Sequence, residues 1–197
     1  MLILWSGGVD STLILYKSLI QSNRGCSVRT LSINHPQVAG VKRMKEARAA
    51  IVSYLKQRYD FSTIEIDFQV DGKTIDDIKH DGLTQPLLWL FPALMYVDDD
   101  EPIVTGDIEG SGVLRHFDKL LGIVDYSAAI LGKRITMDTP LLHYSKAEVI
   151  KEFRSLDENL FLMTRYCESK KKKPCMKCGS CIVHATALWQ LESKLIR

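Results

Sequence analysis

The stretch Ser6-Gly7-Gly8-Val9-Asp10-Ser11 decides the fold of this chain. It follows a short apolar run at residues 2–5 and precedes a segment whose apolar side chains repeat at helical spacing, so it joins a strand to a helix. Glycines let the backbone turn and approach a ligand closely, and the amides at a helix N-terminus favour a bound anion. The stretch therefore predicts a phosphate-binding loop, although Gly-Gly and a serine can also form a plain strand-to-helix turn.

Strand and helix patterns alternate on either side of this loop. Further strands are predicted at residues 28–33, 63–68, 103–105 and 135–137, and helices at residues 13–20, 44–55, 86–97, 113–131, 145 onward and 179 onward. Residues 71–85 are polar and indicate a loop or short helix. Ser145 and Glu148 form a capping-box pattern at the start of one helix. This alternation predicts an α/β fold with a parallel sheet.

The composition limits what the chain can be. Its 197 residues are 46% hydrophobic and 25% charged, which is typical of a soluble globular domain with a small appendage. We expect an α/β domain at residues 1–160 and a small segment at 161–197 packed on it. The net charge of +2 gives no global reason to expect nucleic-acid or membrane binding. The apolar run at residues 87–97 is too short for a membrane span, so a cytoplasmic location is expected.

Four of the five cysteines lie close together in the pattern C-x7-C-x2-C-x2-C, and the fifth, Cys26, stands apart. In a reducing compartment, clustered cysteines indicate a metal rather than disulfides. Four thiolates complete a tetrahedral Zn²⁺ site without an open position, which is a structural site. An iron–sulfur cluster is the rival interpretation, and zinc is favoured because other signs of redox chemistry are absent from the sequence. The predicted ligands are Cys167, Cys175, Cys178 and Cys181.

The glycine-containing loop resembles the PP-loop of the ATP pyrophosphatases, which cleave ATP between its α and β phosphates. This resemblance implies a doubly wound sheet of the adenine-nucleotide α-hydrolase-like (HUP) type, with pyrophosphate held by the loop and adenine near the end of the second strand. The ATP-binding residues that it implies are Ser6, Gly7, Gly8, Val9, Asp10, Ser11, Thr12, Leu31, Ser32 and Gly106.

The loop and the four-cysteine pattern together resemble the 7-cyano-7-deazaguanine synthase family. Pro140-Leu141-Leu142 and the run from Ser145 to Ile150 are similar to that family's signature before the zinc region, and Gln37 matches a residue of its second-strand segment. Residues 106–117 depart from the family's pattern after the fourth strand. The chain is identified as a divergent member, with ATP, Mg²⁺ and Zn²⁺ as cofactors.

The resemblance implies a reaction in two activations. ATP converts the carboxylate of 7-carboxy-7-deazaguanine to an acyl-adenylate, and ammonia then forms the amide. A second adenylation on the amide oxygen, followed by loss of AMP, leaves the nitrile. The implied partners are the deazapurine carboxylate and ammonia. A homodimer is consistent with the family, whereas direct contact with nucleic acid or a membrane is not expected.

Catalytic roles are predicted for Asp10 and Lys146, because Asp10 can hold Mg²⁺ and Lys146 lies in the matching signature at a helix N-terminus. Asp10 can equally cap its helix, and Lys146 can equally be a solvated lysine. Weaker candidates for substrate contact are Gln37, Asp107 and Arg115, with a turn-forming aspartate as the plain alternative for Asp107. The remaining candidates for charge or proton transfer are Lys119, His116 and His143.

Two other functions remain open at this stage. One is a PP-loop enzyme that modifies tRNA directly, for which the lysine run at residues 170–173 is the support, or an enzyme that stops at a deazaguanine amide. A solvated loop is the more ordinary interpretation of that run. The other is a non-catalytic nucleotide-binding protein with a zinc-stabilised interface, which the altered segment at residues 106–117 would fit.

Overall fold

The computed structural model describes residues 1–22, 27–34, 40–67 and 84–194, without the side chains of residues 84, 85 and 194. Cys26, Gln37 and most of the polar segment at residues 71–85 lie outside the described residues, so their predictions stay untested.

Five parallel strands form one sheet in the order β3-β2-β1-β4-β5. The strands are β1 (Leu2–Leu4), β2 (Arg29–Asn34), β3 (Ser62–Asp67), β4 (Pro102–Val104) and β5 (Thr136–Asp138). The register pairs Leu2 with Arg29 on one side of β1 and with Ile103 on the other. The strands β1, β2 and β3 therefore follow one another toward one edge of the sheet. The chain then returns to the other side of β1, where β4 and β5 follow one another toward the opposite edge. This is the predicted doubly wound α/β topology.

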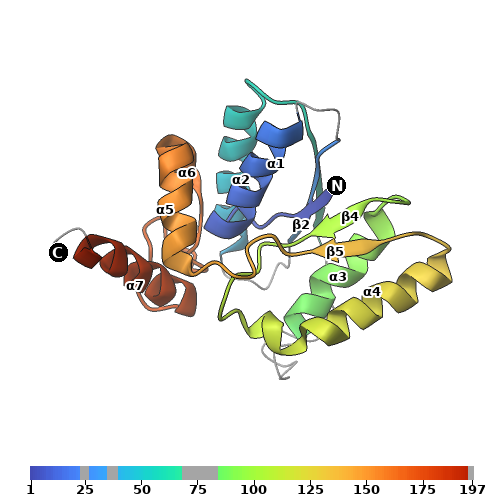
Figure 1. Ribbon diagram of the computed structural model, residues 1–197. Helices are drawn as coiled ribbons and strands as arrows, with labels where there is room; N and C mark the ends of the chain where they lie inside the picture. The colour runs from blue at the N-terminus through green and yellow to red at the C-terminus, as the bar shows by residue number, and fades with distance from the viewer. Residues whose placement is uncertain (23–26, 35–39, 68–83, 195–197) are drawn as a thin grey trace.

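Helices cover both faces of this sheet (Figure 1). They are α1 (Val9–Ser22), α2 (Val41–Leu55), α3 (Thr84–Tyr96), α4 (Phe117–Leu131), α5 (Lys146–Leu156), α6 (Glu158–Met163) and α7 (Gly179–Lys194), with a 3₁₀ turn, η2, at Gly112–His116. Helices α1 and α2 lie on one face, and α3 and α4 lie on the other (Figure 1). None of the helices in the described ranges is long and apolar enough to cross a membrane.

Alternating side chains of the strands fill two separate cores. Leu2 and Ile103 point into the core under α3 and α4, whereas their neighbours Ile3 and Val104 point into the core under α1. This alternation follows from the two-residue period of a strand, and strands buried on both faces read as continuous apolar runs. Phe161 and Ala187 belong to the same core as Ile3, so the C-terminal helices complete it.

Several predicted elements differ from the structure in detail. The helix predicted over residues 113–131 is divided, because η2 occupies Gly112–His116 before α4 starts at Phe117. Helix α6 was not predicted as a separate element. It is separated from α5 by Asp157, whose backbone is extended and whose carboxylate accepts the Leu160 N–H as an N-cap. The boundary expected after residue 160 therefore falls inside a helix. The capping box of Ser145 and Glu148 is confirmed.

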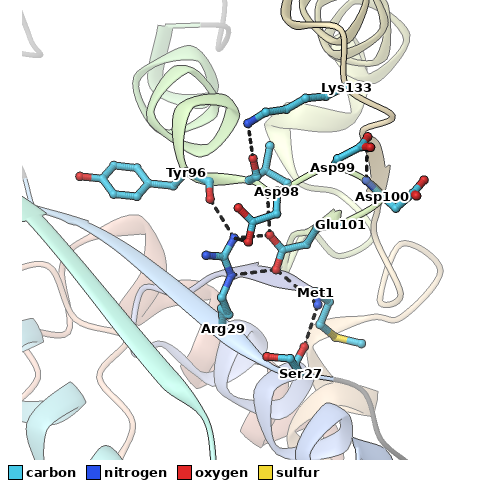
Figure 2. A network of polar contacts seen from close by, with 10 residues as sticks. Met1, Ser27, Arg29, Tyr96, Asp98, Asp99, Asp100, Glu101 and Lys133 are labelled. Carbon is cyan, nitrogen blue, oxygen red and sulfur yellow. Dashed lines mark hydrogen bonds and ion pairs between the residues drawn. The ribbon is translucent and has the colours of Figure 1, made fainter.

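A polar network joins the amino-terminal ends of three strands, at the edge opposite the glycine loop (Figure 2). Arg29, the first residue of β2, donates to both carboxylate oxygens of Glu101 and, over 2.8 Å, to the Tyr96 carbonyl. Glu101 precedes β4 and also accepts the Asp98 N–H over 2.9 Å, while the Met1 amino group lies 3.5 Å from it. The network therefore ties the starts of β1, β2 and β4 together.

Replacing Glu101 by glutamine is expected to destabilise the fold in a pH-dependent way. Burial opposes ionisation of Glu101, but the Arg29 hydrogen bond and the Asp98 N–H outweigh it and hold the pKa below its ordinary value of 4.5. A depressed pKa means that the stabilisation is fully present above pH 4.5 and is lost as the pH falls through the folded-state pKa. We expect a deficit of about 1–2 kcal/mol at pH 7 that shrinks below pH 4.5, as measured by urea unfolding. An equal deficit at both pH values would contradict this account.

Candidate phosphate-binding site and cysteine cluster

The loops after β1 and β4 meet at the carboxyl edge of the sheet, where the direction of winding reverses. Open α/β sheets bind their ligands at such a position. Gly106 follows β4 and packs on the start of α1, so that a Cβ atom there would lie 2.9 Å from the Ser11 nitrogen. No larger residue fits without moving backbone. The topology thus brings the two predicted segments, residues 6–12 and residue 106, into contact.

Hydroxyl groups and glycines give the first loop its shape. The Ser6 and Ser11 hydroxyls are 3.0 Å apart, and Ser6 Oγ accepts the Gly8 N–H over 3.1 Å. Gly7 has a φ of +80°, which favours glycine. The Thr12 N–H donates to the Gly8 carbonyl over 3.1 Å, so the helical hydrogen bonds begin there. The first amides of a helix have no partners within it, and this loop therefore presents donors suited to an anion.

Other residues predicted to bind ATP support the loop from inside the protein. Thr12 is fully buried, and its hydroxyl accepts the Trp5 indole N–H over 3.0 Å. The buried Ser32 hydroxyl donates to the Trp5 carbonyl over 2.7 Å. Val9 and Leu31 lie in the two hydrophobic cores. These side chains position the end of β1, and any contact of residues 31–32 with adenine stays a prediction.

Asp10 and Lys146 form an ion pair across the start of two helices. Lys146 is the first residue of α5, and its Nζ lies 2.7 Å from each carboxylate oxygen of Asp10 in the first turn of α1. The side chains are 26% and 13% exposed, respectively, so the pair is accessible but partly desolvated. Asp10 is the second residue of α1 and is therefore not its N-cap. The structure brings together the two residues for which catalytic roles were predicted, although it does not test those roles.

A buried histidine lies close to this pair. His184 of α7 stacks on Tyr166, with 3.7 Å between ring centroids, and on Phe161 from farther away. Burial, together with the positive charge of Lys146, lowers the pKa of His184 to about 4. The ring is therefore neutral at pH 7 and adds no charge near the loop. His184 was not among the histidines predicted from the sequence, because its two aromatic neighbours lie about twenty positions before it in the chain.

The weaker candidates lie on the segments that follow β4 and β5. Asp107 accepts the hydroxyls of Thr105 and Ser111 over 2.9 and 3.0 Å, which stabilises the turn after β4. His116 is half-buried in η2, and the exposed ones are Arg115, Lys119 and His143. A contact of Asp107 or Arg115 with substrate stays a prediction.

The four predicted metal ligands come together in one cluster. Their sulfur atoms all lie within 4.8 Å of one another, and Cys175 Sγ is 3.9 Å from Cys181 Sγ. Tetrahedral zinc with bonds of about 2.3 Å places its sulfurs about 3.8 Å apart. A four-iron cluster binds each cysteine through a different iron and spreads the sulfurs farther. The compact donor set therefore fits a single Zn²⁺ ion.

Hydrogen bonds within the cluster favour thiolate at one position and oppose it at another. Burial opposes ionisation of Cys167, but the Ser169 hydroxyl and N–H and the Cys175 N–H outweigh it and lower the pKa to about 6. Burial and the neighbouring sulfurs raise the pKa of Cys181 to about 12. Without a cation the four groups cannot all ionise together, since negative charges at this separation repel one another. A bound divalent cation would allow all four cysteines to ionise to thiolates.

Arg165 connects the cysteine cluster to the glycine loop of residues 6–11, called the phosphate loop below. Its N–H donates to the Gly7 carbonyl over 2.9 Å, and its guanidinium donates to four backbone carbonyls of the cysteine-bearing loop, those of Cys167, Ser169, Lys171 and Lys172. On the other side, a Cβ atom on Gly40 would lie 2.6 Å from the Glu168 carbonyl oxygen. The segment around the first ligand therefore contacts the residue before α2 and the phosphate loop after β1, while the lysine side chains of residues 170–173 stay exposed.

Sequence reasoning missed Arg165 and one other arginine, Arg48. Arg48 occupies the apolar stripe of α2 at helical spacing with Met44, Ile51 and Leu55, and it is 1% exposed. An arginine within an apolar stripe is unusual because burying its charge requires partners. The position of Arg48 within an apolar stripe was therefore the sequence feature that could have indicated a buried, paired arginine.

Comparison with known proteins finds two similarities. Residues 115–192, which include Lys146 and the four clustered cysteines, match the family described as queuosine biosynthesis protein QueC. The chain is also 28% identical to the 7-cyano-7-deazaguanine synthase of Acetivibrio thermocellus, in an alignment that spans 92% of this chain and 89% of that protein. The chain is thus similar to QueC over its C-terminal part and to a 7-cyano-7-deazaguanine synthase over most of its length, and the four clustered cysteines lie in the part that matches QueC.

Proposed function

We propose that this protein is an ATP-dependent synthase that converts 7-carboxy-7-deazaguanine and ammonia to 7-cyano-7-deazaguanine. The observation that carries the proposal is the Asp10–Lys146 pair. Lys146 lies in the segment that matches the family, and Asp10 lies in the phosphate loop outside that segment, yet the fold brings their charged groups to 2.7 Å. Two features recognised separately in the sequence thus form one site.

In the proposed reaction the protein positions and neutralises charge. The carboxylate oxygen attacks the α-phosphorus of ATP and pyrophosphate leaves. Ammonia then displaces AMP from the acyl carbon and loses a proton, giving the amide. Adenylation of the amide oxygen by a second ATP releases pyrophosphate again, and loss of AMP and the N–H protons leaves the nitrile. The loop amides would hold the pyrophosphate, and Lys146 would offset charge that develops on the α-phosphate.

The two cations implied for this reaction would have different tasks. Mg²⁺ commonly binds through one or two carboxylates plus substrate phosphates, and Asp10 is the loop carboxylate suited to it, where the ion would neutralise phosphate charge. This requires Lys146 to give up part of its contact with Asp10 when ATP binds. Zn²⁺ at the four cysteines would be structural, since its coordination leaves no open position.

The test is mass spectrometry of the purified protein incubated with 7-carboxy-7-deazaguanine, ATP, Mg²⁺ and ammonium. We expect the nitrile, with AMP formed at two equivalents per product because each activation consumes one ATP. Reactions without ammonium, or with guanine in place of the carboxylate, are the controls. An amide as the final product would restrict the function to the first activation. Absence of both AMP and product would refute the proposal.

One observation favours direct action on tRNA as a second candidate. The lysines at residues 170–173 are all exposed, on the loop whose carbonyls accept hydrogen bonds from Arg165, so they present four positive charges to solvent. If these lysines bind tRNA, affinity should fall steeply as salt increases. Tight, salt-dependent tRNA binding and AMP formation only with tRNA would favour this candidate over the synthase.

A further inference from the structure

Arg48 lies directly beneath the phosphate loop and contacts residues in or next to three strands. Its guanidinium donates to the Ser6 carbonyl, two residues after β1, over 3.2 Å, to the side-chain oxygen of Asn34, the last residue of β2, and to Glu65 within β3 over 2.9 Å. Its aliphatic stem fills the space under Gly7, where a Cβ atom would lie 2.7 Å from Arg48 Cγ. The cation and the loop are therefore in direct contact.

The charge of this arginine is only partly balanced by its neighbours. Of its three partners, the carbonyl and the amide oxygen are neutral, and Glu65 is the one carboxylate that pairs with it among the described residues. The Glu65 side chain is 41% exposed, whereas that of Arg48 is 2% exposed, so solvent screens the carboxylate more than the cation. The nearby Asp67 carboxylate is paired with Lys45 over 2.7 Å. Asp67 also interacts electrostatically with Arg48, but the partner of the guanidinium at the loop is the neutral Ser6 carbonyl, so no carboxylate pairs with Arg48 on that side among the described residues.

We propose that Arg48 is a positioning residue that sets the affinity of the loop for the pyrophosphate part of ATP. It acts through the Ser6 carbonyl and the Gly7 backbone, and its buried charge favours the anion above it. This inference rests on the proposed function only so far as the loop binds phosphates. It does not depend on which carboxylate is activated.

A merely structural role would give a different pattern of variant effects. Arg48→Met removes both the charge and the hydrogen bonds, so it weakens binding under either account. Arg48→Lys keeps the charge but cannot reach three acceptors at once, because an ammonium lacks the planar fork of a guanidinium. Glu65→Gln keeps an acceptor for Arg48 Nε and removes only the opposing charge. An electrostatic role of Arg48 therefore predicts that Glu65→Gln binds the anion more tightly. A purely structural role predicts that the affinity of Glu65→Gln for the anion is not increased.

The experiment is isothermal titration calorimetry of the full chain with inorganic pyrophosphate and with ATP, each in the presence of Mg²⁺. Relative to the unmodified protein, we expect about tenfold weaker binding for Arg48→Met, about threefold weaker binding for Arg48→Lys, and about twofold to threefold tighter binding for Glu65→Gln. Glu46→Gln is the matched control, because Glu46 lies on the same helix in an exposed pair with Arg43. Its binding should equal that of the unmodified protein.

The outcomes separate this inference from the proposed function. Unchanged or weaker binding in Glu65→Gln would overturn the inference even if Arg48→Met fails to fold, since Glu65 is a partly exposed strand residue whose change keeps the hydrogen bond. If the expected order of affinities appears but no nitrile is formed, the inference stands and the synthase function fails. If the unmodified protein binds neither pyrophosphate nor ATP, both fail.

Discussion

Asp10→Asn is expected to lower AMP formation from ATP by about a hundred- to a thousandfold while leaving the chain folded. The substitution keeps the size of the side chain but removes the charge that pairs with Lys146 at 2.7 Å. Without that charge the loop loses its suitable magnesium ligand and the positioning of Lys146. Because the pair is partly exposed and lies at the protein surface, the cost to stability should stay small, about 1 kcal/mol or less. Asp10→Ala should behave in the same way.

A second ion pair between the same two helices provides the control for this experiment. Lys17 of α1 and Glu152 of α5 are 2.6 Å apart, so Glu152→Gln removes a comparable contact away from the loop. AMP release should be unchanged in Glu152→Gln and strongly reduced in Asp10→Asn, with similar melting temperatures for the two variants. Full turnover in Asp10→Asn would remove the loop carboxylate from the proposed mechanism.

Cys178→Ser should lose the metal and destabilise the protein. A serine hydroxyl is a poor ligand for zinc, and metal binding at such a site contributes directly to folding free energy. If about 3 kcal/mol of that contribution is lost, the melting temperature of a chain of this size falls by roughly 6–12 °C. The measurements are metal content by inductively coupled plasma mass spectrometry and thermal unfolding by circular dichroism.

The effect of this substitution should extend to the phosphate loop. The Arg165 N–H donates to the Gly7 carbonyl, and the Arg165 guanidinium donates to the Cys167 carbonyl. If the cysteine cluster becomes disordered, Arg165 is no longer held in place and its hydrogen bond to Gly7 weakens. We expect weaker pyrophosphate binding in Cys178→Ser. Cys26→Ser serves as the control, because Cys26 is the cysteine outside the predicted ligand set. A metal-free Cys178→Ser protein with unchanged stability would rule out a structural metal.

Local chemistry explains why much of the candidate site could be predicted. The glycine loop, the cysteine spacing and the Ser145 capping box each depend on residues within about fifteen positions of one another, so sequence neighbours are also spatial neighbours. The alternation of strands and helices is a similarly local pattern. Helix α6 was missed because its separation from α5 depends on one extended residue, Asp157, which the Tyr54 hydroxyl also holds from another helix.

Contacts between distant segments could not be predicted in the same way. In the sequence, Arg48 and Arg165 are ordinary charged residues. Only the folded structure shows that Arg48 contacts segments of three strands and that Arg165 contacts the cysteine-bearing loop. The same holds for His184, whose neighbours Phe161 and Tyr166 lie about twenty residues away. Such contacts follow from packing, which a local pattern does not encode.

The sequence by itself predicted the glycine loop between a strand and a helix, the cluster of four cysteines and an α/β fold with a parallel sheet, because each is encoded by residue types at short, regular spacing, while the doubly wound sheet was implied by the resemblance to the PP-loop family. Only the tertiary structure decided that Lys146 reaches Asp10, that Gly106 lies against Ser11, and that Arg48 and Arg165 hold Gly7 from two sides. The physical reason is that a sheet ordered β3-β2-β1-β4-β5 brings loops separated by about a hundred residues to one edge, where buried charges and close backbone contacts act together.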